Sequence, residues 1–265
     1  MMKLAITCTL LIFCQCAHAA SLLYSENFDD QDIDQPSVGS IQVVRSIGPM
    51  ITCTEGIDYT VSAQGRNGSN GSFLSLQTEA NLDAESWIWW PYSETWPANQ
   101  MYVSFWLRYP HFVSTDAHEN LKLFYPHWDG TSSYVAYDLS SDDSMYHSEK
   151  SNDEYVSTGN WLTVPNQTDG NWHHYEFFLD FEMGISRFIY DDSIIWDKNW
   201  GPGTWTVPVP MYYLTFCMID AEEPGNFTRQ IDDIEVWDGM PDVGDVPISD
   251  NDAPTAPANL RIIQP

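Results

Sequence analysis

Five side chains in the middle of the chain have the chemistry that a β-elimination needs. They are two cations and three groups that can accept or donate a proton: Arg108, Lys122, His127, Tyr137 and Glu176. In such a reaction a cation neutralises a carboxylate on the substrate, a base removes the neighbouring proton, and an acid protonates the leaving oxygen. We treat the five as candidate catalytic residues for cleavage of a carboxylated sugar chain.

The two cations are expected on one open, concave face of a sheet. Alternation along a strand over residues 101–109 assigns Val103, Phe105 and Leu107 to the core. It assigns Arg108 to the opposite face. The same pattern over residues 121–125 places Lys122 beside Arg108. The alternative is a ladder of charge pairs between strands, and it is the interpretation that we favour.

Tryptophans supply a second kind of candidate site. Indole rings are flat apolar surfaces on which sugar rings stack, while neighbouring polar groups take the hydroxyls. The candidate ligand-binding residues are Trp87, Trp89, Trp90, Trp106 and Trp128. A chain with twelve tryptophans must bury several of them, and Trp106, which lies within a predicted strand, suits a half-buried position.

These residues need a rigid scaffold, and the sequence predicts one made of strands. Short alternating or aromatic runs recur between turn residues, and no helical period follows residue 20. Pairs such as Asp129-Gly130 and Asp169-Gly170 supply tight turns. We expect strands over residues 41–45, 72–77, 101–109, 121–125, 133–139, 173–181, 185–190, 211–219 and 230–237, with irregular segments at 87–100, 140–160 and 197–210. The fold class is therefore all-β.

The segment from Asn171 to Trp196 resembles a hairpin of the laminin G and pentraxin domains. In that hairpin a Trp-His-His strand precedes a strand that ends in a Tyr-Val-Asp-Gly turn, and Asp192 stands here in place of the Gly. The resemblance implies an antiparallel jelly-roll β-sandwich of the concanavalin A-like type over residues 21–240. Because side chains alternate along a strand, His173 and His174 point to opposite faces, and at least one is expected to be structural.

The two ends of the predicted sandwich also resemble carbohydrate-active jelly rolls, which often open with Glu-x-Phe and close with Asp-Asp-Ile-x-Val. In several such families these carboxylates hold a structural calcium ion, which prefers several oxygen ligands. The matching residues are Glu26, Asp232 and Asp233. The resemblance implies a calcium site there, with solvated strand-end acids as the alternative, and no organic cofactor.

Three functions stay open. We expect first a lectin-like protein that binds a polysaccharide, second a divergent polysaccharide lyase or glycoside hydrolase, and third a secreted structural or adhesive module. No Glu is followed by Asp two residues later, so the Glu-x-Asp-x-x-Glu strand of retaining glucanases is absent. His-Glu-x-x-His and Gly-x-Ser-x-Gly are absent as well. These absences favour binding over catalysis.

The chain is strongly acidic. It has 38 Asp and Glu against 10 Lys and Arg, a formal net charge of -28 at pH 7. Such a surface repels nucleic acid, whose capture depends on Lys and Arg. A polyanionic glycan is disfavoured too, unless a local basic patch or bound cations reverse the sign. We expect a glycan partner, no nucleic acid, no transmembrane segment and, by default, a monomer.

The ends of the chain predict export. Residues 1–20 read as a secretory signal peptide, with Lys3, an apolar run to Phe13 and small residues before Ser21. The protein is expected to be secreted, with the periplasm as the alternative. Cys53 and Cys217 are the two cysteines after that segment, and export favours a disulfide between them. Residues 241–265, rich in Asp, Pro and Ala, are expected to form a tail or linker.

Overall fold

The computed structural model describes most of the predicted sandwich. It describes residues 20–27, 40–43, 50–53, 57–60, 65–68, 73–77, 86–90, 96, 98–112, 121–128, 133–141, 143–205, 211–219 and 227–241. The backbone alone is described at residues 26, 40–43, 50–53, 57–60, 73–77, 86–90, 111–112, 121, 140–141, 211–219 and 227. The predicted signal peptide, apart from residue 20, and the predicted tail beyond residue 241 lie outside the described residues.

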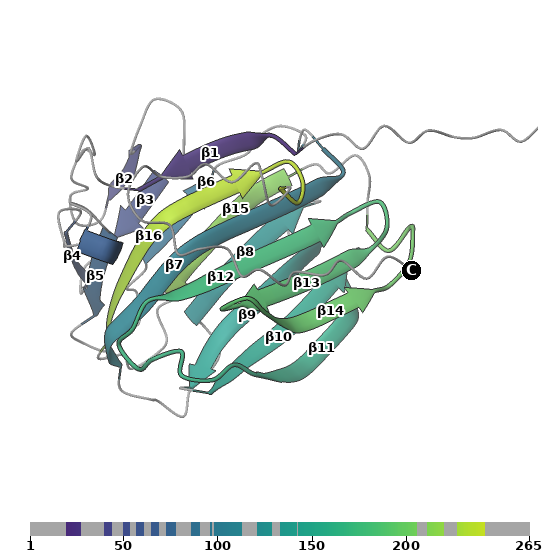
Figure 1. Ribbon diagram of the computed structural model, residues 1–265. Helices are drawn as coiled ribbons and strands as arrows, with labels where there is room; N and C mark the ends of the chain where they lie inside the picture. Colours follow the sequence, from purple (N-terminus) through teal and green to yellow (C-terminus); the bar gives the residue numbers. More distant parts are fainter. Residues whose placement is uncertain are drawn as a thin grey trace, which may run out of the picture.

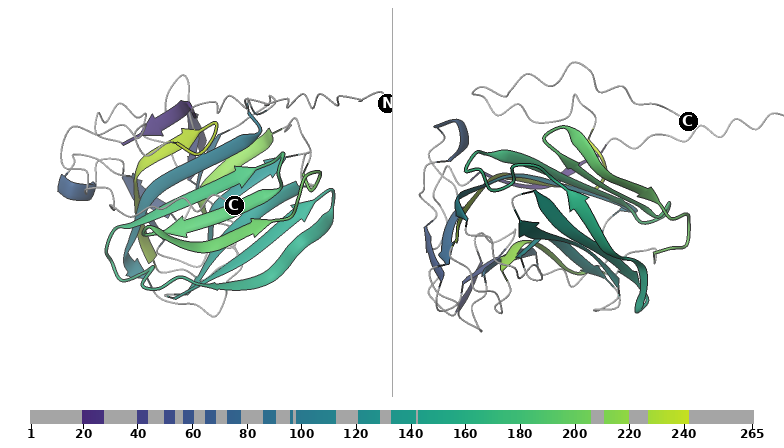
Figure 2. Two further views of the ribbon diagram at one scale, coloured as in Figure 1. Left: turned by 45° about the vertical axis from the view of Figure 1, so that its right-hand side comes forward. Right: turned by 90° about the horizontal axis from the view of Figure 1, so that it is seen from below.

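Two antiparallel sheets of eight strands each pack face to face (Figure 1). The first, which we name the β7 sheet, has the spatial order β14 (Ser193–Asn199), β13 (Ile185–Tyr190), β12 (His173–Asp180), β7 (Gln100–Phe112), β16 (Phe227–Trp237), β5 (Phe73–Gln77) and β4 (Ile57–Thr60), with β1 (Leu22–Glu26) also paired to β16. The second, the β8 sheet, has the order β11 (Glu154–Thr163), β10 (Ser144–Ser151), β9 (Ser133–Ser141), β8 (Leu121–Trp128), β15 (Met211–Ile219), β6 (Ser86–Trp90), β3 (Met50–Cys53) and β2 (Ser40–Val43). The view from below in Figure 2 shows the two layers edge on.

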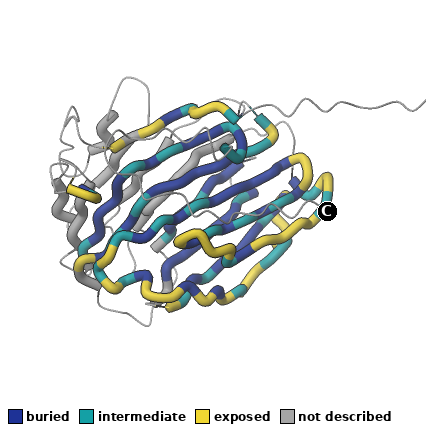
Figure 3. Tube along the Cα trace, in the orientation of Figure 1, coloured by how far each residue is buried: buried dark blue, intermediate teal, exposed yellow. Residues whose placement is uncertain are grey.

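Alternation along the strands builds the core between the layers. Val103, Phe105 and Leu107 of β7 are fully buried, as the pattern predicts. Their rings and branches meet side chains from the other sheet: Phe124 of β8 stacks on Phe177 of β12 with ring centroids 4.5 Å apart. Figure 3 shows the buried positions running along the central strands and the exposed ones at the turns and edges.

The predicted hairpin forms between β12 and β13, and β14 follows it directly. Asp191 and Asp192 both have positive φ, 44° and 63°, in the two-residue turn between β13 and β14. Asp and Asn tolerate this left-handed conformation better than other non-glycine residues, so Asp192 replaces Gly without breaking the turn. In the described residues the regular structure outside the strands is one 3-10 turn, η1 (Arg66–Gly68). No helix in the described part of the chain is long and apolar enough to cross a membrane.

The strand predictions are confirmed, with one shorter strand at 40–43, but strands also enter all three segments predicted as irregular and fill most of residues 140–160. Residues 86–90 form β6, residues 144–163 form β10 and β11, and residues 193–199 form β14. The middle segment was predicted as irregular because polar residues lie at its inward positions, where they are paired with each other. β10 buries His147 and Glu149 in contact with each other, so its inward face does not read as apolar in the sequence.

Candidate functional site

The outward surface of the β8 sheet gathers basic, aromatic and imidazole side chains. On β9, Val135, Tyr137 and Leu139 face the core, which leaves Tyr134 and Asp138 on the opposite face, where Asp138 is only 4% exposed. Strand pairing places His127 of β8 opposite Tyr134, and Lys150 of β10 opposite Tyr134 from the other side. A second cross-strand pair, between the same two strands, joins Lys122 to Asp138. We name this surface the β8 face: Lys122, Tyr125, His127, Tyr134, Asp138 and Lys150.

His127 lies at the centre of the β8 face. Its ring stacks on Tyr134 with centroids 5.2 Å apart, and Tyr125 meets it edge on at 4.1 Å. Burial, and after it the positive charges of Lys122 and Lys150, lower the pKa of His127 to about 3. The ring is therefore neutral at pH 7, and the low pKa makes it a weak base.

The two lysines lie over tyrosine rings of the same face. Lys122 Nζ lies 5.2 Å from the centroid of the Tyr125 ring, and Lys150 Nζ lies 6.0 Å from that of Tyr134. Lys150 also contacts the exposed carboxylate of Asp153 at 3.0 Å. Both lysines lower the pKa of His127, so the electrostatic potential at that ring is raised by positive charge despite the acidity of the whole chain. These two lysines are the local positive charge that an anionic ligand requires, and Asp138 and Asp153 offset part of it.

Tyr134 supplies a proton donor to the same surface. Burial, and then its contact with Tyr155, raise the pKa of the Tyr134 hydroxyl well above the usual value for tyrosine. The hydroxyl therefore keeps its proton in neutral solution and can donate a hydrogen bond. Neutral imidazole, phenol and ammonium groups together can bind the carboxylate and hydroxyls of a sugar acid.

Arg108 does not share this surface, which corrects the prediction that it lies beside Lys122. β7 and β8 follow each other in the chain but belong to different sheets. Alternation within each strand cannot show that the chain crosses between layers after residue 112. Arg108 instead donates from Nε to Gln230 Oε1 at 2.6 Å, and its guanidinium lies 4.8 Å from the ring centroid of Trp172.

Tyr137 lies in the interior, contrary to the expectation of an accessible acid or base. It is 0% exposed, its hydroxyl is 3.2 Å from Ser186 Oγ, and its ring stacks on His147 at 4.2 Å. Burial, followed by the negative charge of Glu149, raises the pKa of Tyr137 well above its usual value. No surface-bound ligand reaches this hydroxyl in the described structure.

A buried polar cluster lies beneath the β8 face, next to Tyr137. His147 Nδ1 is 3.0 Å from the Ala136 carbonyl oxygen, and Nε2 is 2.9 Å from Glu149 Oε1. Both His147 and Glu149 are 0% exposed. The indole nitrogens of Trp196 and Trp200 donate to the two oxygens of Glu149, at 3.3 Å and 2.5 Å. The cluster therefore ties β9 and β10 of one sheet to β14 and the residue after it.

Glu176 and Trp106 come together on the opposite, outward face of the β7 sheet. Tyr102 donates its hydroxyl to Glu176 Oε2 at 2.6 Å, and His174 Nδ1 lies 3.4 Å from Oε1. Burial raises the pKa of Glu176, but His174 and Tyr102 outweigh it, so the pKa is lowered overall. Trp106 stacks on His174 at 4.8 Å, and the Arg66 guanidinium lies 4.2 Å from its ring centroid. Protein groups thus contact the indole that was expected to hold a sugar.

The other tryptophan predictions have different outcomes. Trp128 is 0% exposed and packs edge on against Phe181 and Trp205, so the structure places it in the core and not in a ligand site. Trp87, Trp89 and Trp90 lie in β6, in the β8 sheet, where Trp89 pairs with Thr215 and Thr215 pairs with Tyr125. Their side chains lie outside the described residues, and their contact with a glycan stays a prediction.

Two of the acids proposed for calcium, Asp232 and Asp233, lie in β16 and contact Arg66 at the start of η1. Asp233 Oδ2 accepts from the Arg66 guanidinium at 2.9 Å and 2.5 Å, and Asp232 Oδ2 accepts from the Arg66 amide at 2.8 Å. Arg66 thus supplies a positive charge to Asp233. The described side chains hold no group of three or more His, Cys, Asp or Glu arranged for a metal. Glu26 pairs with Ile234 through the backbone, but its side chain is not described, so the calcium site stays a prediction.

The cysteines lie in one sheet but not on adjacent strands. Cys53 is in β3 and Cys217 in β15, and β6 runs between these two strands. Their side chains are outside the described residues, and the disulfide stays a prediction.

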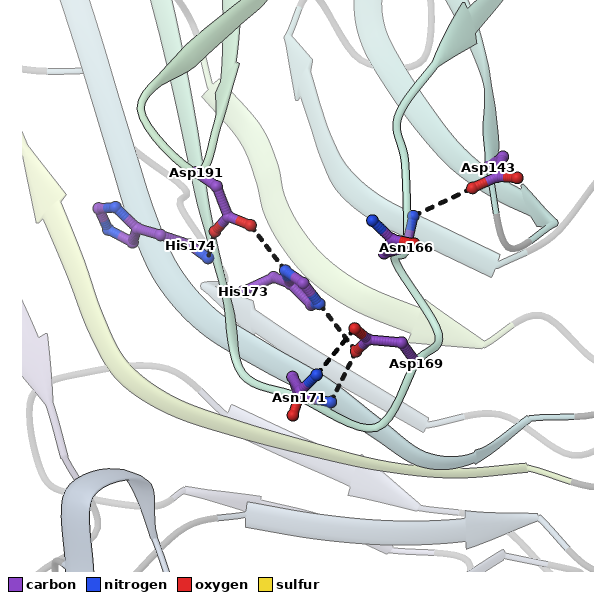
Figure 4. Close-up of polar contacts among 7 residues, drawn as sticks. All are labelled: Asp143, Asn166, Asp169, Asn171, His173, His174 and Asp191. Atoms are coloured by element: carbon purple, nitrogen blue, oxygen red, sulfur yellow. Dashed lines mark hydrogen bonds and ion pairs between the residues drawn. The ribbon is translucent and has the colours of Figure 1, made fainter.

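His173 is the structural histidine of the hairpin, as expected for one of the pair. Figure 4 shows its ring between two carboxylates, with Nδ1 2.7 Å from Asp191 Oδ2 and Nε2 3.0 Å from Asp169 Oδ1. Burial lowers the pKa of His173, but the hydrogen bonds to Asp191 and Asp169 raise it overall. Asp191 also accepts from the His174 amide, so the cluster fixes the start of β12.

Sequence reasoning found Lys122 and His127 but missed Tyr125, Tyr134 and Lys150. The available signal was the alternation of residues 144–151, where Tyr146, Ser148 and Lys150 share one face. Assigning that stretch to a loop hid the pattern.

The chain is similar to known proteins in structure. No family model and no curated protein matches the chain. Domain 4 of AbnA, a GH43 extracellular arabinanase from Geobacillus stearothermophilus solved with arabinotriose, is 18% identical with a TM-score of 0.50, over 84% of this chain and 94% of that one. Cellulose-induced protein Cip1 is 13% identical with a TM-score of 0.50, over 80% and 96% of the two chains. The binding domain of Paraclostridial Mosquitocidal Protein 1 is 10% identical with a TM-score of 0.53, and the match spans 83% of this chain and 49% of that one.

Identities this low carry information about the fold alone. The two antiparallel eight-stranded sheets, the confirmed hairpin and these structural neighbours agree with each other. The chain is a jelly-roll sandwich of the concanavalin A-like type, and no family within that fold is identified.

Proposed function

We propose that the β8 face binds a polysaccharide that carries carboxylate groups, and that the protein does so outside the cell. The observation that carries the proposal is the pair Lys122 and Lys150 near His127, Lys122 on the same strand and Lys150 in the same row across β9, in a protein with a net charge of -28. Tyr125 and Tyr134 add aromatic surface at the same place. A structural neighbour solved with an arabinose trisaccharide supports the use of this fold for glycans. Export rests on the predicted signal peptide.

Binding without cleavage comes first because His127 is only 4% exposed. The second candidate is β-elimination, for which an imidazole stacked on a protonated tyrosine supplies the two groups, but the pKa of about 3 makes His127 a weak base and is a further reason to rank binding first. In that reaction His127 would remove the C5 proton of a uronate, the C4–O bond would break as a C4=C5 double bond forms, and Tyr134 would protonate the leaving oxygen. Lys122 and Lys150 would neutralise the carboxylate.

One set of experiments separates these functions. The purified protein is incubated with uronate polysaccharides (alginate, pectate) and neutral ones (arabinan, xylan), and binding is measured by calorimetry. Absorbance near 235 nm detects unsaturated ends. We expect uronate binding that weakens as salt is added, because the contact is between charges. Lys122→Ala and Lys150→Ala should each weaken it about tenfold, the equivalent of one charge-assisted hydrogen bond.

Lys198→Ala is the matched control, because Lys198 lies on β14 of the other sheet, over Trp196. It should leave binding unchanged. Equal affinity of the wild type for neutral and uronate chains, or equal losses in all three lysine variants, would contradict the proposed site. New absorbance at 235 nm that Tyr134→Phe abolishes would make the protein a lyase.

A further inference from the structure

The edge strand β11 carries two large aromatic side chains that are mostly exposed. Tyr155 is 59% and Trp161 54% exposed. Rings that are this exposed contribute little buried apolar surface to the stability of the fold. β11 is the last strand of the β8 sheet and pairs with β10, the strand of Lys150. The two rings therefore lie next to the β8 face.

Strand pairing places both rings in the rows that cross the β8 face. Tyr155 is opposite Lys150, which is opposite Tyr134. Trp161 is opposite Tyr146, which is opposite Asp138. Residues directly opposite in an antiparallel pair share a face of the sheet. Each row thus ends in an exposed aromatic ring on β11.

Two irregularities of register in β11 shorten the distance between these rings. Tyr155 and Trp161 are six residues apart, but their partners Lys150 and Tyr146 are only four apart, and the pairing shifts at two places between them. At about 3.3 Å per residue, the rings are held roughly 13 Å apart along the strand, where a regular strand would separate them by roughly 20 Å. Gly159 lies in this stretch with a φ of 71°, a conformation that glycine adopts without strain. β-Bulges of this kind often re-aim side chains beside functional sites.

Contacts with the β8 face hold the rings in place. The Tyr134 hydroxyl lies 3.5 Å from that of Tyr155, and Trp161 meets Tyr146 edge on at 5.4 Å. The Tyr146 hydroxyl is 3.5 Å from Thr158 Oγ1, within the irregular stretch. The two rings are therefore part of the same layer of side chains as Tyr134. The exposed part of each ring faces solvent.

We propose that Tyr155 and Trp161 form a second stacking platform, so that the site takes a long polysaccharide chain lying across the strands. The inference rests on the proposed function of the β8 face. Four adjacent strands from β8 to β11 span about 15 Å at their usual spacing, which is longer than a single sugar ring. The inner part, at Lys122 and His127, selects the carboxylate, and the platform on β11 adds affinity for extended chains only.

Binding of a length series tests the platform. Calorimetry compares alginate and pectate, and their fractions from disaccharide upward, on the wild type, Trp161→Ala, Tyr155→Ala and Trp161→Phe. Each alanine variant should lose about threefold to tenfold in affinity for long chains, the range for one aromatic contact. Disaccharide binding should not change, and Trp161→Phe, which keeps a ring, should lose less. Ile194→Ala, at an equally exposed apolar residue on β14 of the other sheet, is the control and should have no effect.

The outcomes separate this inference from the proposed function. If Lys122→Ala weakens binding while Trp161→Ala and Tyr155→Ala do not, the β8 face binds glycans and the platform does not exist. If the wild type binds none of the chains, both ideas are refuted. If the two alanine variants change the sedimentation coefficient instead of the affinity, the rings belong to an interface between copies, and the platform is again refuted. Thermal unfolding of each variant identifies any that fails to fold, and Trp161→Phe then carries the comparison.

Discussion

Replacing Glu149 with alanine removes one partner of a pair that is fully enclosed between the sheets. Glu149 accepts from Trp196, from Trp200 and from His147, and neither Glu149 nor His147 is exposed. Breaking a buried pair on one side costs about 3–5 kcal/mol, because the remaining partner stays buried without compensation. For a sandwich of this size each kcal/mol shifts the unfolding midpoint by about 2–4 °C, so we expect a fall of roughly 6–20 °C.

Denaturant unfolding followed by circular dichroism measures this loss, and the neighbouring residue provides the control. Lys150 points outward from the same strand, and its contact with Asp153 is largely solvated. Lys150→Ala should change the free energy of unfolding by less than about 1 kcal/mol while it weakens glycan binding. Glu149→Gln should fall between the two, because its amide would present a donor to an indole donor. A loss below about 1 kcal/mol in Glu149→Ala would refute the assignment of the cluster as a tie between the sheets.

The remaining predictions concern pH and calcium. The pKa of His173 is raised overall by Asp191 and Asp169, so the stability its protonated ring contributes is complete below the unfolded-state value near 6.5 and is lost as pH rises through the higher folded-state value. In the wild type the unfolding midpoint should therefore fall as pH rises above 6.5, and in His173→Gln this fall should be smaller. Plots of midpoint against pH that run parallel for the variant and the wild type would contradict this. If calcium binds through Glu26 and Asp232, calcium should raise the unfolding midpoint relative to chelator, and Glu26→Gln should abolish the rise; equal midpoints with and without calcium would exclude the site.

Much of the fold could be predicted from the sequence, because its signals are local. Alternation on β7 and turn residues such as Asp191-Asp192 depend only on neighbouring positions. The Trp-His-His strand was recognisable for the same reason. A polar pair that is satisfied only after folding, such as His147 with Glu149, looks like a loop until its partners on other strands are known.

The candidate site was harder to predict because it depends on which strands become neighbours. Lys122 and Lys150 come from strands separated by β9, whereas Arg108, closer to Lys122 in the sequence, lies in the other sheet. Alternation assigns a side chain to one of two faces, but it does not say which sheet the strand joins. The pairing between strands that builds the β8 face therefore cannot be read from the pattern along a single strand.

The positions of the last two strands set the order in which the molecule can assemble. β15 lies between β8 and β6, and β16 lies between β7 and β5, so each is an inner strand of its sheet. Without β15 the β8 sheet is two separate pieces, and without β16 the β7 sheet is three, because β1 and the pair β5–β4 are both joined to β7 only through β16. In each sheet one piece comes from strands between residues 100 and 199 and the rest from strands before residue 91. During synthesis neither sheet can therefore be completed until residues 211–237 have been made, and until then the strands next to β15 and β16 have unpaired edges. Pairings this distant in sequence close slowly, and refolding is expected to be limited by the entry of these two strands.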